Sequence, residues 1–350
     1  MIDIIFISVV GLMLGLFLSW GFKTLPGERW QIIATIPFIK DSSGQWKGIN
    51  LTYYGFFSAT AYLFSIVLIF VLFGAIDIPA PMIFILVTSV LAVCVPASSL
   101  VARIVEKKRH TFSVAGAFFV GVIIVPPVIY IINSLLADSF SSEIPFIPAL
   151  AAISVAYAFG EGLGRLGCIS FGCCYGKSLA DTSPLVQKLF SRWNFVFTGD
   201  TKKIAYASGL SGTKVLPIQG ITAVLYVTTG LLGVFMFLKT FYIATFVLTM
   251  VVTQVWRLYS ETLRADYRGS GKITAYQVMA IAATLYAMFV GIFLSDLSQP
   301  VVDLQDGLQT LWDPIMLLFL QFIWLAIFIY TGRSSVTEST VAFRVCRERI

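Results

Sequence analysis

Residues 146–176 read FIPALAAISVAYAFGEGLGRLGCISFGCCYG, an apolar run that passes into a glycine-rich segment carrying Glu161 and Arg165. The apolar part predicts a helix that crosses a lipid bilayer, for which about 20 residues are needed. A charged side chain at membrane depth is costly and normally faces a polar cavity or a partner, so it marks a functional site. This stretch therefore indicates the fold class and contains the first candidate site.

The apolar character extends over the whole chain. Of its 350 residues, 58% are hydrophobic and only 12% are charged, and the mean hydropathy is +0.88. Apolar runs of the length that spans a bilayer occur at residues 2–22, 52–74, 81–103, 112–136, 146–164, 217–238, 241–260, 275–294 and 313–331. The sequence therefore predicts an all-α, polytopic integral membrane helix bundle with about nine transmembrane helices and a small extramembrane head.

Cysteine and histidine content argues against a metal centre. The chain has five cysteines, Cys94, Cys168, Cys173, Cys174 and Cys346. Their spacing matches neither a disulfide framework nor paired zinc ligands. Cys168, Cys173 and Cys174 are interpreted as small packing residues, with a reactive thiol as the alternative. Because His110 is the single histidine, we expect no metal and no cofactor. The net charge of +6 is explained by anionic lipid headgroups rather than by nucleic acid.

Charge alternates between the loops. Lys and Arg concentrate in residues 23–51, 103–111, 165–215 and 257–273 and after 332, while acidic residues crowd the other loops. The positive-inside tendency places the basic loops in the cytoplasm. Basic residues that bind an anionic substrate would give the same pattern on whichever face holds the site. Within the longest connection, about 177–214, a short amphipathic segment after Pro184 predicts an interfacial helix in a head or lid.

Glu161 and Arg165 are four residues apart and share a helix face, where neighbouring glycines let a backbone or a lipid headgroup approach. The structural alternative is a glycine-mediated helix crossing with an ion pair. The charges favour a functional site because they lie in a membrane segment.

A second polar stripe lies on one face of the run 241–260 and just after it. Its members, Gln254, Arg257, Glu261 and Arg264, are spaced three and four apart, so the stripe is predicted to face inward. Guanidinium groups are suited to bind phosphate, and Glu261 could hold two of them in orientation. The alternative is a set of arginines that extend to the membrane interface.

Two further segments have ordinary explanations beside functional ones. Tyr54, near the start of the second run, is typical of an interface anchor. The basic segment 107–110 is interpreted as a solvated charge run, although His110 could serve as a base if it turned inward.

Taken in order, these segments resemble the prolipoprotein diacylglyceryl transferase family of bacterial membrane enzymes. The similarity runs from about residue 50 to about residue 290. The landmarks that carry it are Tyr54-Gly55, Arg103-Ile104, Gly164-Arg165-Leu166-Gly167 with Gly172 and Gly176, Pro217 and Gln219, the set Arg257, Glu261 and Arg264, and Gln277. The resemblance implies an additional N-terminal helix and loop (1–51), a transferase-like membrane domain (52–294) and an additional C-terminal helix with a basic tail (295–350).

Members of that family transfer the diacylglyceryl unit of phosphatidylglycerol to a lipobox cysteine and release glycerol phosphate. The resemblance implies a multi-pass transferase of the bacterial inner (cytoplasmic) membrane, with an anionic phospholipid as donor. Arg165 and Arg257 would stabilise the departing phosphate, Glu261 would orient them, and His110 would be the base. The substrate-binding residues would be Tyr54, Arg103, Glu161, Gly167, Gly172, Gln219 and Arg264.

The chain departs from the family at acid–base positions. Ser113 stands where the family has an essential histidine, and Cys168 where it has an asparagine. The missing histidine supports an alternative, a catalytically inactive relative that binds or moves lipids. A transporter of small solutes would predict repeated halves with broken helices, and the sequence has no such symmetry. The family's site opens outward while the charge bias here places it inside, so the orientation and the acceptor stay open.

Overall fold

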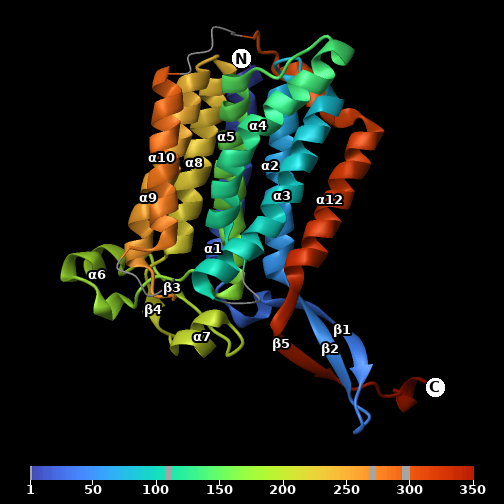
Figure 1. Cartoon of the computed structure of the whole chain (residues 1–350). Helices are drawn as coiled ribbons and strands as arrows, with labels where there is room; N and C mark the ends of the chain where they lie inside the picture. The colour runs from blue at the N-terminus through green and yellow to red at the C-terminus, as the bar shows by residue number, and fades with distance from the viewer. Residues whose placement is uncertain (1, 108–111, 268–272, 294–299) are drawn as a thin grey trace.

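The computed structural model describes residues 2–107, 112–267, 273–293 and 300–350. Within these residues, nine helices are long and apolar enough to cross a membrane (Figure 1). They are α1 (Ile2–Thr24), α2 (Tyr53–Gly74), α3 (Ala80–Glu106), α4 (Val114–Phe140), α5 (Phe146–Phe171), α8 (Ile218–Leu238), α9 (Tyr242–Leu263), α10 (Ala275–Phe293) and α12 (Pro314–Gly332). The predicted multi-pass membrane helix bundle is confirmed. Helix α5 is longer than expected, because it continues past residue 164.

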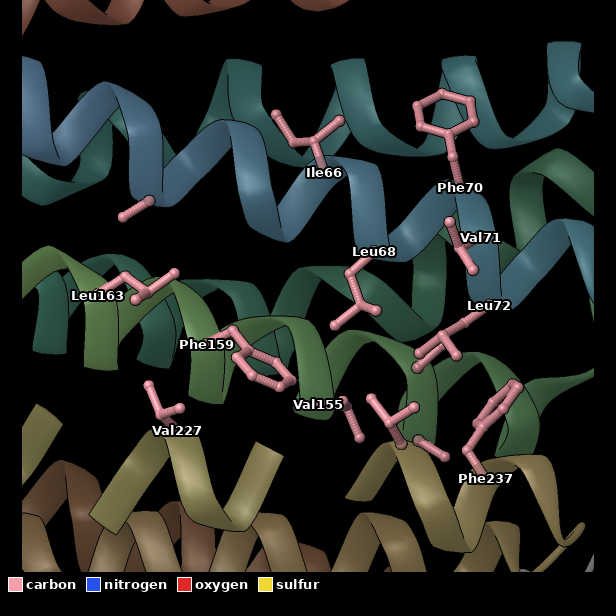
Figure 2. Close-up of a cluster of buried hydrophobic side chains, with 14 of the residues drawn as sticks. Ile66, Leu68, Phe70, Val71, Leu72, Val155, Phe159, Leu163, Val227 and Phe237 are labelled. Carbon is pink, nitrogen blue, oxygen red and sulfur yellow. The ribbon is translucent and has the colours of Figure 1, made fainter. Parts of the chain in front are cut away.

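Helix α5 is the centre of the bundle, with α2, α8 and α9 packed against it. In its most apolar stretch, 78% of the residues are buried inside the protein, whereas the corresponding share in α1 is 11%. Figure 2 shows Val155, Phe159 and Leu163 of α5 between Leu68 of α2 and Val227 of α8. Charges on the inner turns of α5 are therefore held away from lipid by neighbouring helices.

Helices α1 and α12 pack on the flanks of the bundle, α1 against α8 and α12 against α2. A Cβ atom on Gly55 would lie 2.2 Å from the Cα atom of Gly332, so this close approach of α2 and α12 requires glycine. The division of the chain at residues 51 and 294 remains a prediction.

A small antiparallel sheet, which the sequence analysis did not predict, lies at one end of the bundle. It is ordered β1 (Ile32–Lys40), β2 (Trp46–Thr52) and β5 (Arg333–Val341). The Oγ1 atom of Thr52 donates to the carbonyl of Gly332 at 2.9 Å, where β5 follows α12. The hairpin of β1 and β2 is local, with Asp41 and Gly44 in its turn, and it was overlooked among the long apolar runs. The pairing of β5 with β2, almost the whole chain apart, leaves no local signal in the sequence. Short helices complete the chain: η1 (Glu28–Trp30), α11 (Leu304–Gln309), η3 (Thr310–Trp312) and η4 (Arg347–Arg349).

The long connection after α5 forms a small head. Its elements are η2 (Leu179–Asp181), α6 (Pro184–Phe190), β3 (Phe195–Val196), α7 (Lys203–Ser208) and β4 (Lys214–Val215). The predicted short helix is present as α6, but its apolar face is divided. Val186 and Phe190 pack inside the head, while Leu185, Leu189 and nearby Trp193 are exposed, as expected for an interfacial helix.

The head and the sheet lie at the same end of the bundle (Figure 1). The ends of α3, α5 and α9 reach this end as well, so the basic loops gather on one side of the membrane spans. Which side of a membrane this is remains a prediction.

Candidate functional site

A polar cavity of about 960 Å³ lies at the basic end of the bundle, between the spans, the head and the sheet. Among the described residues, its lining has six basic and four acidic side chains: Arg103, Arg165, Lys203, Arg257, Arg264, Arg333, Glu106, Glu161, Glu261 and Asp266. The excess of positive charge in a walled space attracts anions, because low-dielectric walls focus the field.

Glu161 joins Arg165 and Arg257, the two arginines that were expected to act together. Arg165 and Arg257 each donate from Nη2 to Glu161, one to each carboxylate oxygen. The hydroxyl of Tyr157 also donates to Glu161 and accepts from Arg257 Nη2 at 2.8 Å. The Glu161 side chain is only 1% exposed. Two guanidinium groups, one from α5 and one from α9, thus converge on a single buried carboxylate.

This network leaves donors unused. The Nε atoms of Arg165 and Arg257 are both buried and have no hydrogen-bond partner in the described part of the chain. An unsatisfied buried donor costs about 1–3 kcal/mol. An oxyanion held by these donors would relieve that cost, and guanidinium groups bind carboxylates and phosphates particularly well.

Arg264 has a different environment, just past the end of α9. It binds Asp266 through two parallel hydrogen bonds, Nε to Oδ1 at 2.8 Å and Nη2 to Oδ2 at 2.6 Å. Its Nη1 lies 3.5 Å from Oε1 of Glu261. The sequence analysis expected Glu261 to orient the arginines of the site, but the carboxylate between Arg165 and Arg257 is Glu161.

The other predicted binding residues divide into two groups. Tyr54 and Arg103 line the cavity. Gln219 is buried and donates to the carbonyl of Cys173 at 2.9 Å, while Gly167 packs against Tyr54 of α2. Gly172 ends α5 in a left-handed conformation with φ of 70°. The last three shape the walls rather than line the cavity as the structure describes it.

The predicted base, His110, lies outside the described residues. Ser113, at the family's histidine position, is buried and caps α4 by accepting a hydrogen bond from the backbone N–H of Gly116 at 3.1 Å. Phe112 and Ser113 both line the cavity. Ser113 therefore lines the site, but its hydroxyl group already serves a structural role as the cap of α4.

Three of the cysteines gather on the cavity wall. The Sγ atoms of Cys168, Cys173 and Cys174 all lie within 4.8 Å of one another. The helix end explains the first contact: Gly172 N–H donates to Ile169 O and Cys173 N–H donates to Cys168 O. These two bonds define a Schellman motif, which brings the residues at positions 168 and 173 side by side.

Cys174 completes the cluster through an unusual backbone conformation, with φ of 56°. Hydrogen bonds with Cys168 and Cys173, together with the nearby guanidinium of Arg264, lower the pKa of the Cys174 thiol well below its usual value. The spacing of the cysteines along the chain gave no sign of this cluster, since the fold brings three of them together on one wall.

A second, mostly apolar pocket of about 260 Å³ continues from the polar cavity into the bundle, lined by α2, α3, α4 and α5. The two spaces share five lining residues: Tyr54, Val114, Glu161, Arg165 and Cys168. The buried charges thus stand at the boundary between a polar chamber and an apolar one.

Sequence reasoning missed several residues of the site. Tyr157 precedes Glu161 by four residues and so shares its helix face, a signal that was available. Lys203 and Asp266 had no such signal, because they reach the cavity from the head and from the segment after α9.

A scan against protein-family models and a search of curated proteins both found no match to this chain. An activity can therefore be inferred only from the geometry of the site and from its sequence motifs.

Proposed function

We propose that this protein is a membrane transferase that uses an anionic phospholipid as donor, in the manner of the prolipoprotein diacylglyceryl transferases, in a bacterial cytoplasmic membrane. The observation that carries the proposal is the convergence of Arg165 and Arg257 on Glu161 in a positively charged cavity. The phosphate of the donor binds beside these guanidinium groups.

In this proposal the unpartnered Nε donors of Arg165 and Arg257 stabilise the negative charge that develops during the transfer. In the transfer, the acceptor's sulfur or oxygen bonds to the glyceryl carbon as the bond from that carbon to the phosphate oxygen breaks. The leaving glycerol phosphate keeps the electron pair, and the acceptor's proton passes to a base. Donors already oriented toward the developing charge stabilise such a transition state without reorganisation. Arg165 Nε and Arg257 Nε are buried and unpartnered, and in this proposal they are the donors that bind the leaving phosphate.

The apolar pocket supports a lipid as donor rather than a soluble phosphate ester. It begins at Arg165 and Glu161 and continues between α2, α4 and α5 along side chains such as Ile66 and Val125. Part of one acyl chain of the donor lying there would bury its apolar surface while the headgroup stayed in the polar cavity.

A second candidate is a protein that binds or moves anionic lipids without transferring them. Ser113 favours it, because the hydroxyl at the family's histidine position caps α4 and is a poor proton acceptor. Both candidates need the arginine pair, and they differ in whether the lipid is consumed.

Incubation of the purified protein with phosphatidylglycerol labelled in its headgroup tests the proposal. Release of glycerol phosphate supports the transferase, provided that Arg165→Ala abolishes it and Lys40→Ala, a change on the distant strand β1, does not. Stoichiometric binding of the lipid without release in the presence of thiol and hydroxyl acceptors would replace the transferase with the lipid-binding candidate.

The orientation of the site decides the class of acceptor. Following the positive-inside tendency, we expect the head to lie in the cytoplasm, so that the acceptor is cytosolic or on the inner leaflet. A cysteine introduced at exposed Lys177 of the head, in a variant without Cys346, should resist a membrane-impermeant thiol reagent in intact cells and react after lysis. Reaction in intact cells would place the head, and with it the acceptor, outside.

A further inference from the structure

The three thiols on the cavity wall are held in a fixed arrangement rather than meeting by chance. The segment that follows them is tied to the end of α9, with Ala265 N–H donating to Tyr175 O at 3.1 Å and Lys177 N–H donating to Leu263 O at 3.0 Å. On the other side, the Gln219 side chain holds the Cys173 carbonyl. Since rigid support is what a preorganised ligand set needs, the cluster has the character of a site.

The backbone conformation of Cys174 also indicates a functional site. A residue with a β-carbon in the left-handed region costs about 1–2 kcal/mol. Such strain persists where the surrounding structure holds it, and it clusters at functional positions. Here it turns the Cys174 side chain back toward Cys168 and Cys173.

The chemistry of the ligand set selects the class of ion. Sulfur ligands select soft or borderline ions such as Zn²⁺, whereas Mg²⁺ and Ca²⁺ prefer oxygen. The separation of the sulfur atoms, at most 4.8 Å, is slightly wider than a tetrahedral site with Zn–S bonds of about 2.3 Å requires. Binding would therefore draw the three thiols together by up to about 1 Å.

The charge of the surrounding side chains also favours a divalent ion of the Zn²⁺ class. Three thiolates and one divalent cation carry a net charge of −1, and Arg165 and Arg264 line the same cavity as the three cysteines. The basic surroundings that would repel a bare cation therefore favour the anionic trithiolate complex.

We propose that Cys168, Cys173 and Cys174 bind one thiophilic divalent ion of the Zn²⁺ class on the wall of the polar cavity. All three cysteines line that cavity, so the fourth coordination position faces the space in which a substrate binds. Three protein ligands with one open position are the arrangement of catalytic rather than structural zinc sites. The metal site stands independently of the proposed lipid transfer, because it follows from the thiols alone.

The test is a titration of the reduced, full-length protein in detergent with Co²⁺, a spectroscopic substitute for Zn²⁺, without oxygen. The double variant Cys94→Ser/Cys346→Ser, which removes the two thiols outside the cluster, serves as the reference. We expect one equivalent of Co²⁺ to bind with a thiolate-to-cobalt charge-transfer band in the near ultraviolet, and Zn²⁺ to displace it.

In the reference background, Cys168→Ser, Cys173→Ser and Cys174→Ser should each weaken Co²⁺ binding by at least about tenfold and reduce the charge-transfer band. A band that survives these substitutions, or no band in the reference protein, would overturn the proposal. Unchanged circular dichroism and monodisperse elution identify variants that have folded.

A measurement on the unsubstituted protein does not depend on the folding of variants. Zn²⁺ should protect Cys168, Cys173 and Cys174 from alkylation, read by mass spectrometry of their peptides, while the exposed Cys346 reacts at the same rate with and without the ion. Equal alkylation of the cluster in both conditions, or a disulfide within it that resists mild reductant, would exclude the metal site.

Discussion

Two arginine networks in this protein bury their charges in different ways. Arg165 and Arg257, inside the bundle, share the single carboxylate of Glu161 and keep two unpartnered Nε donors. Arg264, at the end of α9, binds Asp266 through both of its parallel donors and also approaches Glu261. The first network is therefore incompletely satisfied and suited to a ligand. The second is satisfied within the protein and fixes the chain after α9.

The largest effect is expected from removing the shared carboxylate. Glu161→Gln leaves two guanidinium groups without their counter-charge inside the membrane, which should destabilise the protein by about 3–5 kcal/mol. Asp266→Asn is the matched change in the second network, and we expect it to cost about 1–3 kcal/mol. Unfolding of both variants in detergent measures the difference. Equal costs would mean that the two networks do not differ as described.

The arginines themselves should separate the networks by activity. In the headgroup-release assay, Arg165→Ala and Arg257→Ala should each reduce turnover by about 100-fold or more, the usual effect of removing a donor to the developing negative charge. Arg257→Lys should fail to restore it, because a point charge cannot replace the planar fork.

Arg264→Ala is the control for that experiment. It should lower stability and reduce turnover by less than tenfold at a temperature where the variant is folded, since its donors are occupied by Asp266. A loss as large as that of Arg257→Ala would move Arg264 into the substrate-binding group.

Lys202 differs from the arginines of both networks, because it is a buried cation held mainly by carbonyl groups rather than by carboxylates. Its Nζ donates to Ser170 O at 2.6 Å and to Leu25 O at 3.2 Å, and burial lowers its pKa from 10.5 to about 8. Between these two pH values the unfolded state binds more protons, so the stability should rise with pH by up to about 3 kcal/mol. Below pH 8 both states are protonated and this contribution is constant.

The measurement is the free energy of unfolding of the wild type and of Lys202→Met between pH 7 and pH 10. The difference between the two proteins cancels the other titrating groups and should change steadily above pH 8 in favour of the wild type. A difference that does not vary with pH would show that Lys202 is protonated in the folded protein throughout this range.

Much of the fold could be predicted because the bilayer imposes a length and a composition on each span. All nine predicted spans are helices in the structure, and the polar faces of α5 and α9 followed from the spacing of Glu161, Arg165 and Arg257. The addition of β5 to the β1–β2 hairpin could not be predicted, since β2 and β5 pair across a separation of almost 300 residues. The carboxylate shared by the arginines has the same origin: Glu261 is close to Arg257 in the sequence, whereas Glu161 meets Arg257 only through the packing of α5 against α9.

The membrane-spanning helical class and the inward-facing charges follow from the sequence alone, because each depends on the local composition and spacing of residues along one segment. Tertiary structure decided which carboxylate holds the arginines, which polar and apolar spaces meet at Glu161, and that three cysteines form a cluster. The packing of helices brings together residues that are far apart in the sequence, such as Glu161 and Arg257, 96 positions apart, and a buried charge takes the partner that the packing provides.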